Sequence, residues 1–214
     1  MMVEIIRVVV TPFQQNCRII ADMEAGECVI VDPGGSPEAI LSAVPDEVNC
    51  TGVWLTHSHV DHCGGVKGIA EKLSIKVYGH RSEDIFREKV REICSMYGIS
   101  PDVEGMDICP EPDIYLEGGE EISVGGYVFN VLHVPGHSPG HLAFYNKDRG
   151  VVLAGDVLFA GSIGRTDLPG GNHKQLLASI EEKVFSLPDD TVVMSGHGAD
   201  TTVGAEKRTN PFFL

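Results

Sequence analysis

The sequence lacks an excess of basic residues, because 16 lysines and arginines stand against 31 aspartates and glutamates, for a net charge of -15. Such a chain repels phosphate backbones and anionic lipid surfaces unless its cations gather in one patch. The basic residues from Arg81 to Arg91 alternate with acidic ones, which is typical of a solvated helix face. We therefore expect neither nucleic acid nor a membrane as a partner.

Long apolar runs and paired cysteines are also absent. No stretch reaches the ~20 apolar residues of a membrane span, and the start MMVEIIRVVV, with Glu4, resembles a first strand rather than a signal peptide. The six cysteines lie far apart without a CxxC pair, which argues against a zinc ribbon or a dense disulfide framework and favours free buried thiols. A reducing, cytoplasmic location is predicted.

The composition is that of a globular protein, with 43% hydrophobic and 22% charged residues in 214. Residue patterns predict strands over 4–10, 16–22, 27–35, 53–55, 75–80, 141–146, 150–159 and 190–198, a hairpin over 121–137, a loop over 99–120, and helices over 36–44, 64–73, 82–98 and 172–187. No linker separates the two halves, so one domain over 1–214 is expected. This order predicts an α/β fold, with two mixed sheets packed together and helices on the outer faces.

The stretch THSHVDHCGG, residues 56–65, is rich in metal ligands. His57 and His59 are two residues apart in extended chain, so both side chains can face one ion. Asp61 and His62 follow at once and can face a second ion beside the first. Imidazole nitrogens and carboxylate oxygens suit zinc, iron and manganese alike, so the residue types do not select the metal.

Further ligands must come from distant strand ends, because one loop cannot aim enough donors at one point. Asp156 ends the apolar run VVLAG, His197 follows TVVMSG, and His137 lies in HVPGHSPGH, each at a turn that contains glycine. One such residue alone is usually a turn, cap or packed residue. The whole set in matching contexts predicts a metal site at one edge of a sheet.

The motifs HSHVDH, PGHSPGH, LAGD and SGHG, in this order, resemble the metallo-β-lactamase superfamily over almost the whole chain. The resemblance implies an αββα sandwich with a metal site in a cleft at one edge. Within the superfamily, GRTDLPGG (164–171) and the ending TTVGAEKRTNPF resemble the short, single-domain members of the glyoxalase II (hydroxyacylglutathione hydrolase) group.

The resemblance implies a binuclear hydrolase with two divalent metal ions, zinc as the first choice and iron or manganese as alternatives. The first metal would be held by His57, His59 and His137, the second by Asp61, His62 and His197, and Asp156 would bridge both. A metal-bridging hydroxide, oriented by Asp61 as the catalytic residue, would attack a small thioester such as S-lactoylglutathione or a related hydroxyacyl thioester.

Departures from the longer glyoxalase II enzymes concern the substrate. Those enzymes carry a C-terminal helical region that binds glutathione, and this chain, which ends soon after His197, is expected to be without it. Arg165 falls where the family has a substrate-contacting lysine, and Asp167 where it has a tyrosine. Arg165 is predicted to bind a substrate carboxylate or peptide oxygen, and the alternative is a structural ion pair with Asp167.

Other functions remain open at this point. Persulfide dioxygenases also resemble the sequence, including its GRTD stretch, and would use a single iron on His57, His137 and Asp156. Lactonase and phosphodiesterase chemistry are further alternatives. A non-catalytic, metal-stabilised interaction module is a third class, although a structural zinc site closes its shell with four ligands. The oligomeric state is not determined by the sequence.

Overall fold

The computed structural model describes residues 3–214 and contains two compact units. The first unit comprises the described residues up to Leu116 together with Ser123–Val128, and the second comprises Glu117–Ile122 and Phe129–Leu214. A six-stranded mixed sheet forms the frame of each unit. That the chain is a single domain over 1–214 stays a prediction.

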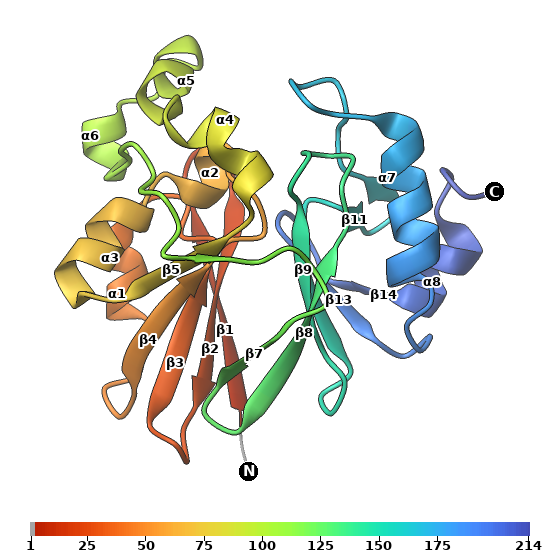
Figure 1. The fold of residues 1–214 in the computed structure, drawn as a ribbon, viewed down its shortest axis with the longest axis horizontal. Helices are drawn as coiled ribbons and strands as arrows, with labels where there is room; N and C mark the ends of the chain where they lie inside the picture. Colours follow the sequence, from red (N-terminus) through yellow and green to blue (C-terminus); the bar gives the residue numbers. More distant parts are fainter. Residues whose placement is uncertain (1–2) are drawn as a thin grey trace. The chain divides into compact units, whose positions relative to one another are not determined.

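The sheet of the first unit follows chain order (Figure 1). Its strands are β1 (Val3–Val10), β2 (Gln15–Asp22), β3 (Glu27–Val31), β4 (Asn49–Trp54), β5 (Lys76–Gly79) and β6 (Ile114–Tyr115). The pairs β1–β2 and β2–β3 are antiparallel, whereas β3, β4, β5 and β6 run parallel. The carboxyl ends of the parallel strands therefore meet at one edge, which is where ligands bind in open sheets of this kind.

The helices of the first unit are α1 (Pro37–Ser42), α2 (Val60–Cys63), α3 (Val66–Leu73), η1 (Arg81–Glu83), α4 (Asp84–Arg87), α5 (Val90–Met96) and α6 (Pro101–Glu104). Val66 and Ile69 of α3 are fully buried in one core with Val53 of β4. The continuous helix expected over 82–98 is broken. The break follows Arg87, whose buried guanidinium donates to the Cys109 carbonyl and to Asp84. The loop expected over 99–120 contains α6 and β6.

The second sheet has the order β14 (Thr201–Thr202), β13 (Val192–Ser195), β10 (Val151–Gly155), β9 (Leu142–Asn146), β8 (Tyr127–His133) and β7 (Glu121–Val124). Strands β10 and β13 form a parallel pair, whereas β9 pairs antiparallel with β10 and with β8. The strand expected over 150–159 ends at Gly155, whose φ of 50° lies in the left-handed region. The chain then forms a separate small ribbon of β11 (Leu158–Phe159) and β12 (Ser162–Ile163).

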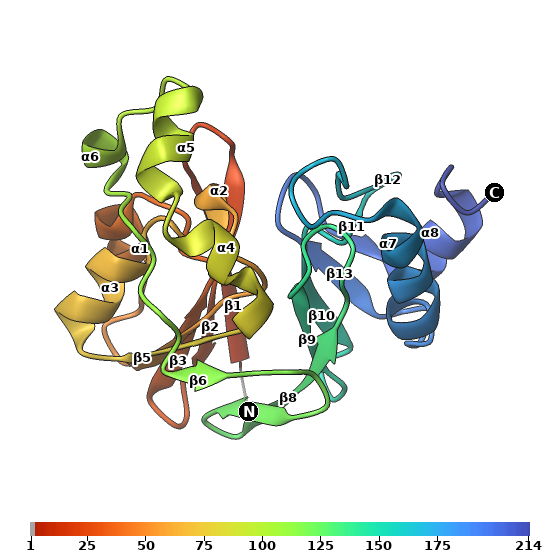
Figure 2. The ribbon, with the colours of Figure 1, turned by 45° about the horizontal axis from the view of Figure 1, so that its top comes forward.

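Two helical segments lie beside this second sheet in Figure 2, namely α7 (His173–Ser179) with its π-helical continuation Ile180–Val184, and α8 (Val203–Thr209). Asn172 caps α7 by accepting from the Gln175 amide at 3.1 Å. Leu176 and Ile180 are spaced to share one helix face, and both are buried in a core with Val152 and Val193. This confirms the helix expected over 172–187. The helix packs through this core against β10 and β13.

The structure shows the state of the cysteines and the lengths of the helices. All six cysteines are free, with Cys50 half-buried and the other five buried. The expectation of free thiols is therefore confirmed. No helix within residues 3–214 is long and apolar enough to cross a membrane.

Candidate metal centre

The ligand loop begins where β4 ends. Trp54 is buried between the neighbouring strands, and the Leu55 amide still donates to the Tyr78 carbonyl of β5 at 3.0 Å. Beyond this last sheet bond the chain leaves the strand and reaches His59, whose backbone is extended and whose carbonyl accepts from the Cys63 amide at the start of α2. The buried apolar strand thus delivers the loop to the carboxyl edge of the sheet.

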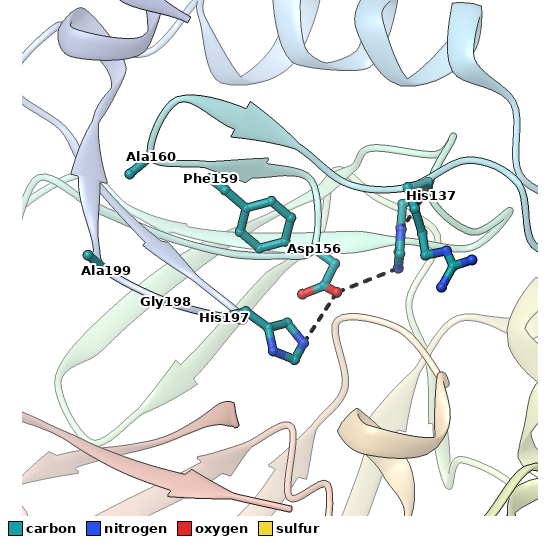
Figure 3. Close-up of a pocket in the computed structure, with 8 residues that line it drawn as sticks. His137, Asp156, Phe159, Ala160, His197, Gly198 and Ala199 are labelled. Carbon is teal, nitrogen blue, oxygen red and sulfur yellow. Dashed lines mark hydrogen bonds and ion pairs between the residues drawn. The ribbon is translucent and has the colours of Figure 1, made fainter. Parts of the chain in front are cut away.

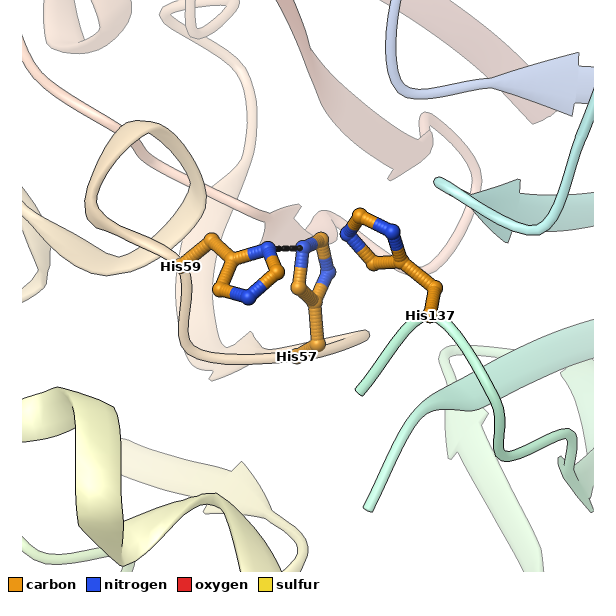
Figure 4. Close-up of side chains that lie close together, drawn as sticks. All are labelled: His57, His59 and His137. Carbon is orange, nitrogen blue, oxygen red and sulfur yellow. Dashed lines mark hydrogen bonds between the residues drawn. The ribbon is translucent and has the colours of Figure 1, made fainter. Parts of the chain in front are cut away.

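His57 and His59 point their ring nitrogens at one another. Figure 4 shows the contact, in which His57 Nε2 and His59 Nδ1 are 3.1 Å apart. Two nitrogens that each lie about 2.0–2.1 Å from one zinc ion are separated by a similar distance. The Phe86 ring packs edge-on against His59 with centroids 4.7 Å apart, and Glu83 accepts from the Ser58 amide at 2.9 Å. These contacts hold the extended segment between the two histidines.

Asp32, directly after β3, forms hydrogen bonds with two residues of the loop, Thr56 and His62. Its Oδ1 accepts from the Thr56 amide at 2.7 Å, and its Oδ2 accepts from the Thr56 hydroxyl at 2.6 Å. His62 Nδ1 lies 3.0 Å from the same Oδ2. Because an ionised carboxylate only accepts, His62 carries its proton on Nδ1 and offers the Nε2 lone pair to a ligand. Asp32 therefore selects the tautomer of His62.

Thr56 extends this control to His57. Its hydroxyl hydrogen points to Asp32, so its oxygen accepts from His57 Nδ1 at 3.0 Å. His57 is thereby also set to present Nε2, and its ring lies 4.1 Å from that of His62 between centroids. Asp61, half-buried on α2, has its Oδ2 4.0 Å from His62 Nε2. The loop thus brings His57 close to His59, and Asp61 close to His62.

A second donor set, made up of His137, Asp156 and His197, contains the remaining candidate metal ligands. Asp156 follows β10 and His197 follows β13, while His137 lies in the loop between β8 and β9. One carboxylate oxygen, Asp156 Oδ2, lies 3.8 Å from His137 Nε2 and 3.5 Å from His197 Nε2 (Figure 3). A single carboxylate between two imidazoles is suited to a position shared by two ions.

Partners distant in the sequence also orient this second set. His137 Nδ1 donates to the Arg165 carbonyl at 2.8 Å, which leaves Nε2 as its ligand atom. The Asp156 amide donates to Nε2 of the fully buried His141 at 3.1 Å. His141 is therefore a supporting residue for Asp156.

Gly164 lies against both Asp156 and His137. A Cβ at this position would stand 1.9 Å from the Asp156 carbonyl oxygen and 3.0 Å from His137 Nδ1. We predict that Gly164→Ala displaces both donors, lowers metal affinity, and destabilises the protein by about 1–3 kcal/mol through overpacking. Metal titration and denaturant unfolding of the metal-free protein measure the two effects.

The control is Gly68→Ala in α3, where the added Cβ meets only Pro37 at 3.6 Å. It should be neutral or slightly stabilising, because alanine is the better helix former. Equal metal affinity in the two variants would refute the role assigned to Gly164.

A pocket of about 380 Å³ opens over the second donor set. Its lining comprises His137, Asp156, Phe159, Ala160, Arg165, His197, Gly198 and Ala199. Asp156 and His197 keep 13% and 26% of their side-chain surface exposed, so a small molecule can reach them. Arg165 lines the pocket and forms an ion pair with Asp167, and its predicted contact with substrate stays a prediction.

Asp32 and Glu83 are the supporting residues that sequence reasoning missed. Asp32 carries the same signal that identified Asp156, an aspartate directly after a buried apolar strand, here in ECVIVDPGG. Its place inside the strand expected over 27–35 concealed its role. Glu83 had no such signal, because it lies among the alternating charges assigned to a solvated helix face, yet it is 1% exposed.

The fold and these two oriented donor sets define a metal-dependent hydrolase. The chain belongs to the metallo-beta-lactamase superfamily, whose family model matches residues 10–197. The prediction of an α/β fold with two mixed sheets is confirmed, because the structure superimposes on that of the BLEG-1 B3 metallo-beta-lactamase with a TM-score of 0.89, at 37% identity, over 99% of this chain and all of the other.

Two further proteins are similar over nearly their whole length. The chain is 39% identical to hydroxyacylglutathione hydrolase GloC of Haemophilus influenzae, covering 95% of this chain and 94% of that protein. The structure of TTHA1623 in a di-iron-bound form matches with a TM-score of 0.86 and 39% identity, over 97% of this chain and 99% of the other. The likeness to the short glyoxalase II group is thereby shown.

Proposed function

We propose that the protein is a binuclear hydrolase of small acyl thioesters, such as S-lactoylglutathione or a related hydroxyacyl thioester. His57, His59 and His137 would hold one divalent ion, Asp61, His62 and His197 the other, and Asp156 would serve both. The observation that carries this proposal is the position of Asp156, whose one oxygen lies near the Nε2 atoms of both His137 and His197.

The donor atoms fit such a pair of ions. The Nδ1 atoms of His57, His62 and His137 each face an acceptor, which directs Nε2 to a ligand in each case. Orientation of this kind by a carboxylate, hydroxyl or backbone carbonyl is typical of metal-binding histidines. The set combines imidazole nitrogens with carboxylate oxygens, so zinc, iron and manganese all suit it, and the di-iron form of TTHA1623 supports iron as an alternative to zinc.

Two such ions would lower the pKa of a water molecule, polarise the thioester carbonyl and stabilise the charge that develops on its oxygen. Asp61 would accept a hydrogen bond from the attacking water and orient it. Arg165 would contact the polar end of the substrate at the rim of the pocket. A thiolate is a good leaving group and needs little help from a general acid, so the carboxylate and imidazoles of the pocket would be available to hold metal.

A thioester is favoured over other acyl substrates because of the named relative GloC. We therefore expect protein purified without chelator to contain about two metal ions per chain and to hydrolyse thioesters faster than lactones, phosphodiesters or β-lactams. Elemental analysis and a thiol-release assay over this panel test both points. Dialysis against a chelator should abolish turnover, and a divalent metal should restore it.

Two outcomes would replace the proposal. One iron per chain, with oxygen consumption on glutathione persulfide, would establish a dioxygenase that uses His57, His137 and Asp156. A metal-loaded protein without turnover on the whole panel would indicate an interaction module.

A further inference from the structure

The guanidinium of Arg165 is already engaged by a carboxylate of the same chain. Arg165 Nε donates to Asp167 Oδ1 at 2.7 Å, and its terminal nitrogen Nη2 donates to Asp167 Oδ2 at 2.8 Å. These two parallel bonds form the bidentate arrangement in which arginine recognises carboxylates generally. Asp167 thus occupies the edge of the fork that a substrate carboxylate would use in the same geometry.

Arg165 belongs to the pocket above the second donor set, so its engagement affects what the pocket can bind. Of the eight residues that line this pocket, Arg165 supplies the cationic side chain, while Phe159, Ala160 and Ala199 supply apolar surface. A substrate can place its acyl or thiol chain on this apolar surface. The far end of the substrate then lies beside the Arg165 guanidinium, whose positive charge is already balanced by Asp167.

The Arg165–Asp167 ion pair carries full charge on both side chains, and both are exposed to solvent. The hydrogen bonds from Arg165 hold the pKa of Asp167 at about 2, so its carboxylate is ionised at every pH at which a hydrolase of this kind operates. The two side chains are 53% and 67% exposed, and solvent screens such pairs so that they contribute little stability. A second carboxylate can therefore displace Asp167, but only in competition with it.

We propose that Asp167 is a specificity-determining residue that selects thioesters with an uncharged thiol portion over thioesters with a carboxylate there. An uncharged thiol portion leaves the Arg165–Asp167 pair intact. A carboxylate must separate the pair or approach the remaining edge of the guanidinium, and in either case it lies beside the negative charge of Asp167. The inference rests on the proposed thioester hydrolysis and narrows its substrate class: it places hydroxyacyl thioesters with an uncharged thiol portion before S-lactoylglutathione, whose glutathione portion carries carboxylates.

The test compares two substrates that differ only in charge, S-acetyl-3-mercaptopropionate and its amide. Asp167→Asn should lower KM for the carboxylate about 5-fold, the upper end for the effect of one exposed ion pair. KM for the amide and kcat for both should stay unchanged, because Asp167 touches neither the metal donors nor the acyl carbon. In an Arg165→Gln background the same substitution should have no selective effect, since the partner of Asp167 is then missing.

Asp189→Asn is the matched control. Asp189 is likewise an exposed aspartate in an ion pair, with Lys207 at 2.7 Å, and its substitution removes the same unit of charge away from the pocket residues. It should leave the preference between the two substrates unaltered. An equal gain in Asp189→Asn, or a gain from Asp167→Asn that survives in the Arg165→Gln background, would overturn the proposal in favour of a general charge effect.

A binding measurement separates this inference from the proposed function. In zinc-loaded protein, the NMR signal of Arg165 Nε–H reports binding of the unreactive thioethers 3-(methylthio)propionate and its amide. The acid should bind about 5-fold more tightly to Asp167→Asn than to the native protein, and the amide equally to both. Absence of thioester turnover with this difference intact would refute only the hydrolase, whereas equal affinity of the acid for both proteins would refute the role of Asp167.

Discussion

Asp156→Asn should leave the protein folded but reduce its metal content from about two ions per chain to one or fewer, and lower thioester turnover by about 1,000-fold. The asparagine amide keeps the size of the carboxylate but loses its negative charge. In the native protein, Asp156 Oδ2 lies near His137 and His197 and would bind both ions. Loss of one ion removes several kcal/mol of stabilisation from the developing oxyanion, and about 1.4 kcal/mol corresponds to each tenfold in rate.

Elemental analysis after gel filtration and initial rates of thiol release measure this prediction. Asp189→Asn serves as the control for a lost negative charge in the same unit and should keep full metal content. Native metal content and native rates in Asp156→Asn would show that the second donor set is not part of the catalytic centre.

Asp32→Asn should weaken metal binding by about 10- to 100-fold, although Asp32 is not a proposed ligand. An asparagine amide group can accept at only one of the two oxygen positions. If its NH2 group replaces Oδ2, it faces the Thr56 hydroxyl and His62 Nδ1, and His62 must then carry its proton on Nε2. His62 Nε2, the proposed metal-binding atom, would then carry a proton and could not bind an ion.

Competition with a chromophoric chelator measures the affinity, and unfolding of the metal-free protein measures the structural cost. Asp22→Asn is the matched control, because Asp22 is also a buried aspartate of the first unit that accepts backbone amides, from Glu24, Ala25 and Gly126. Its substitution should cost stability without changing metal affinity. An identical loss of affinity in both variants would mean that Asp32 acts through stability alone.

The identity of the candidate donors could be predicted from local patterns. Asp156 and His197 follow short apolar runs, and parallel strands such as β10 and β13 necessarily bring their carboxyl ends to the same edge. His57 and His59 are only two residues apart, so their approach needs no long-range information. These positions follow from strand periodicity and glycine-containing turns.

Other features depend on contacts that no local pattern encodes. Glu83 looks like one charge of a solvated helix, but folding buries it where it accepts from the Ser58 amide beside the donors. The continuous helix expected over 82–98 fails for a related reason, since Arg87 turns inward to bond Cys109 far along the chain. Charge alternation alone cannot distinguish these two residues from their exposed neighbours.

The sequence by itself determined which residue types could hold metal and at which strand ends they occur, because hydrophobic periodicity places strands and the turns after them. Only the tertiary structure decided which ring nitrogen each histidine offers. That choice depends on acceptors brought from elsewhere in the chain, Asp32 for His62 and the Arg165 carbonyl for His137. A proton on Nδ1 or on Nε2 decides whether an imidazole can bind an ion, and folding alone supplies the partner that fixes it.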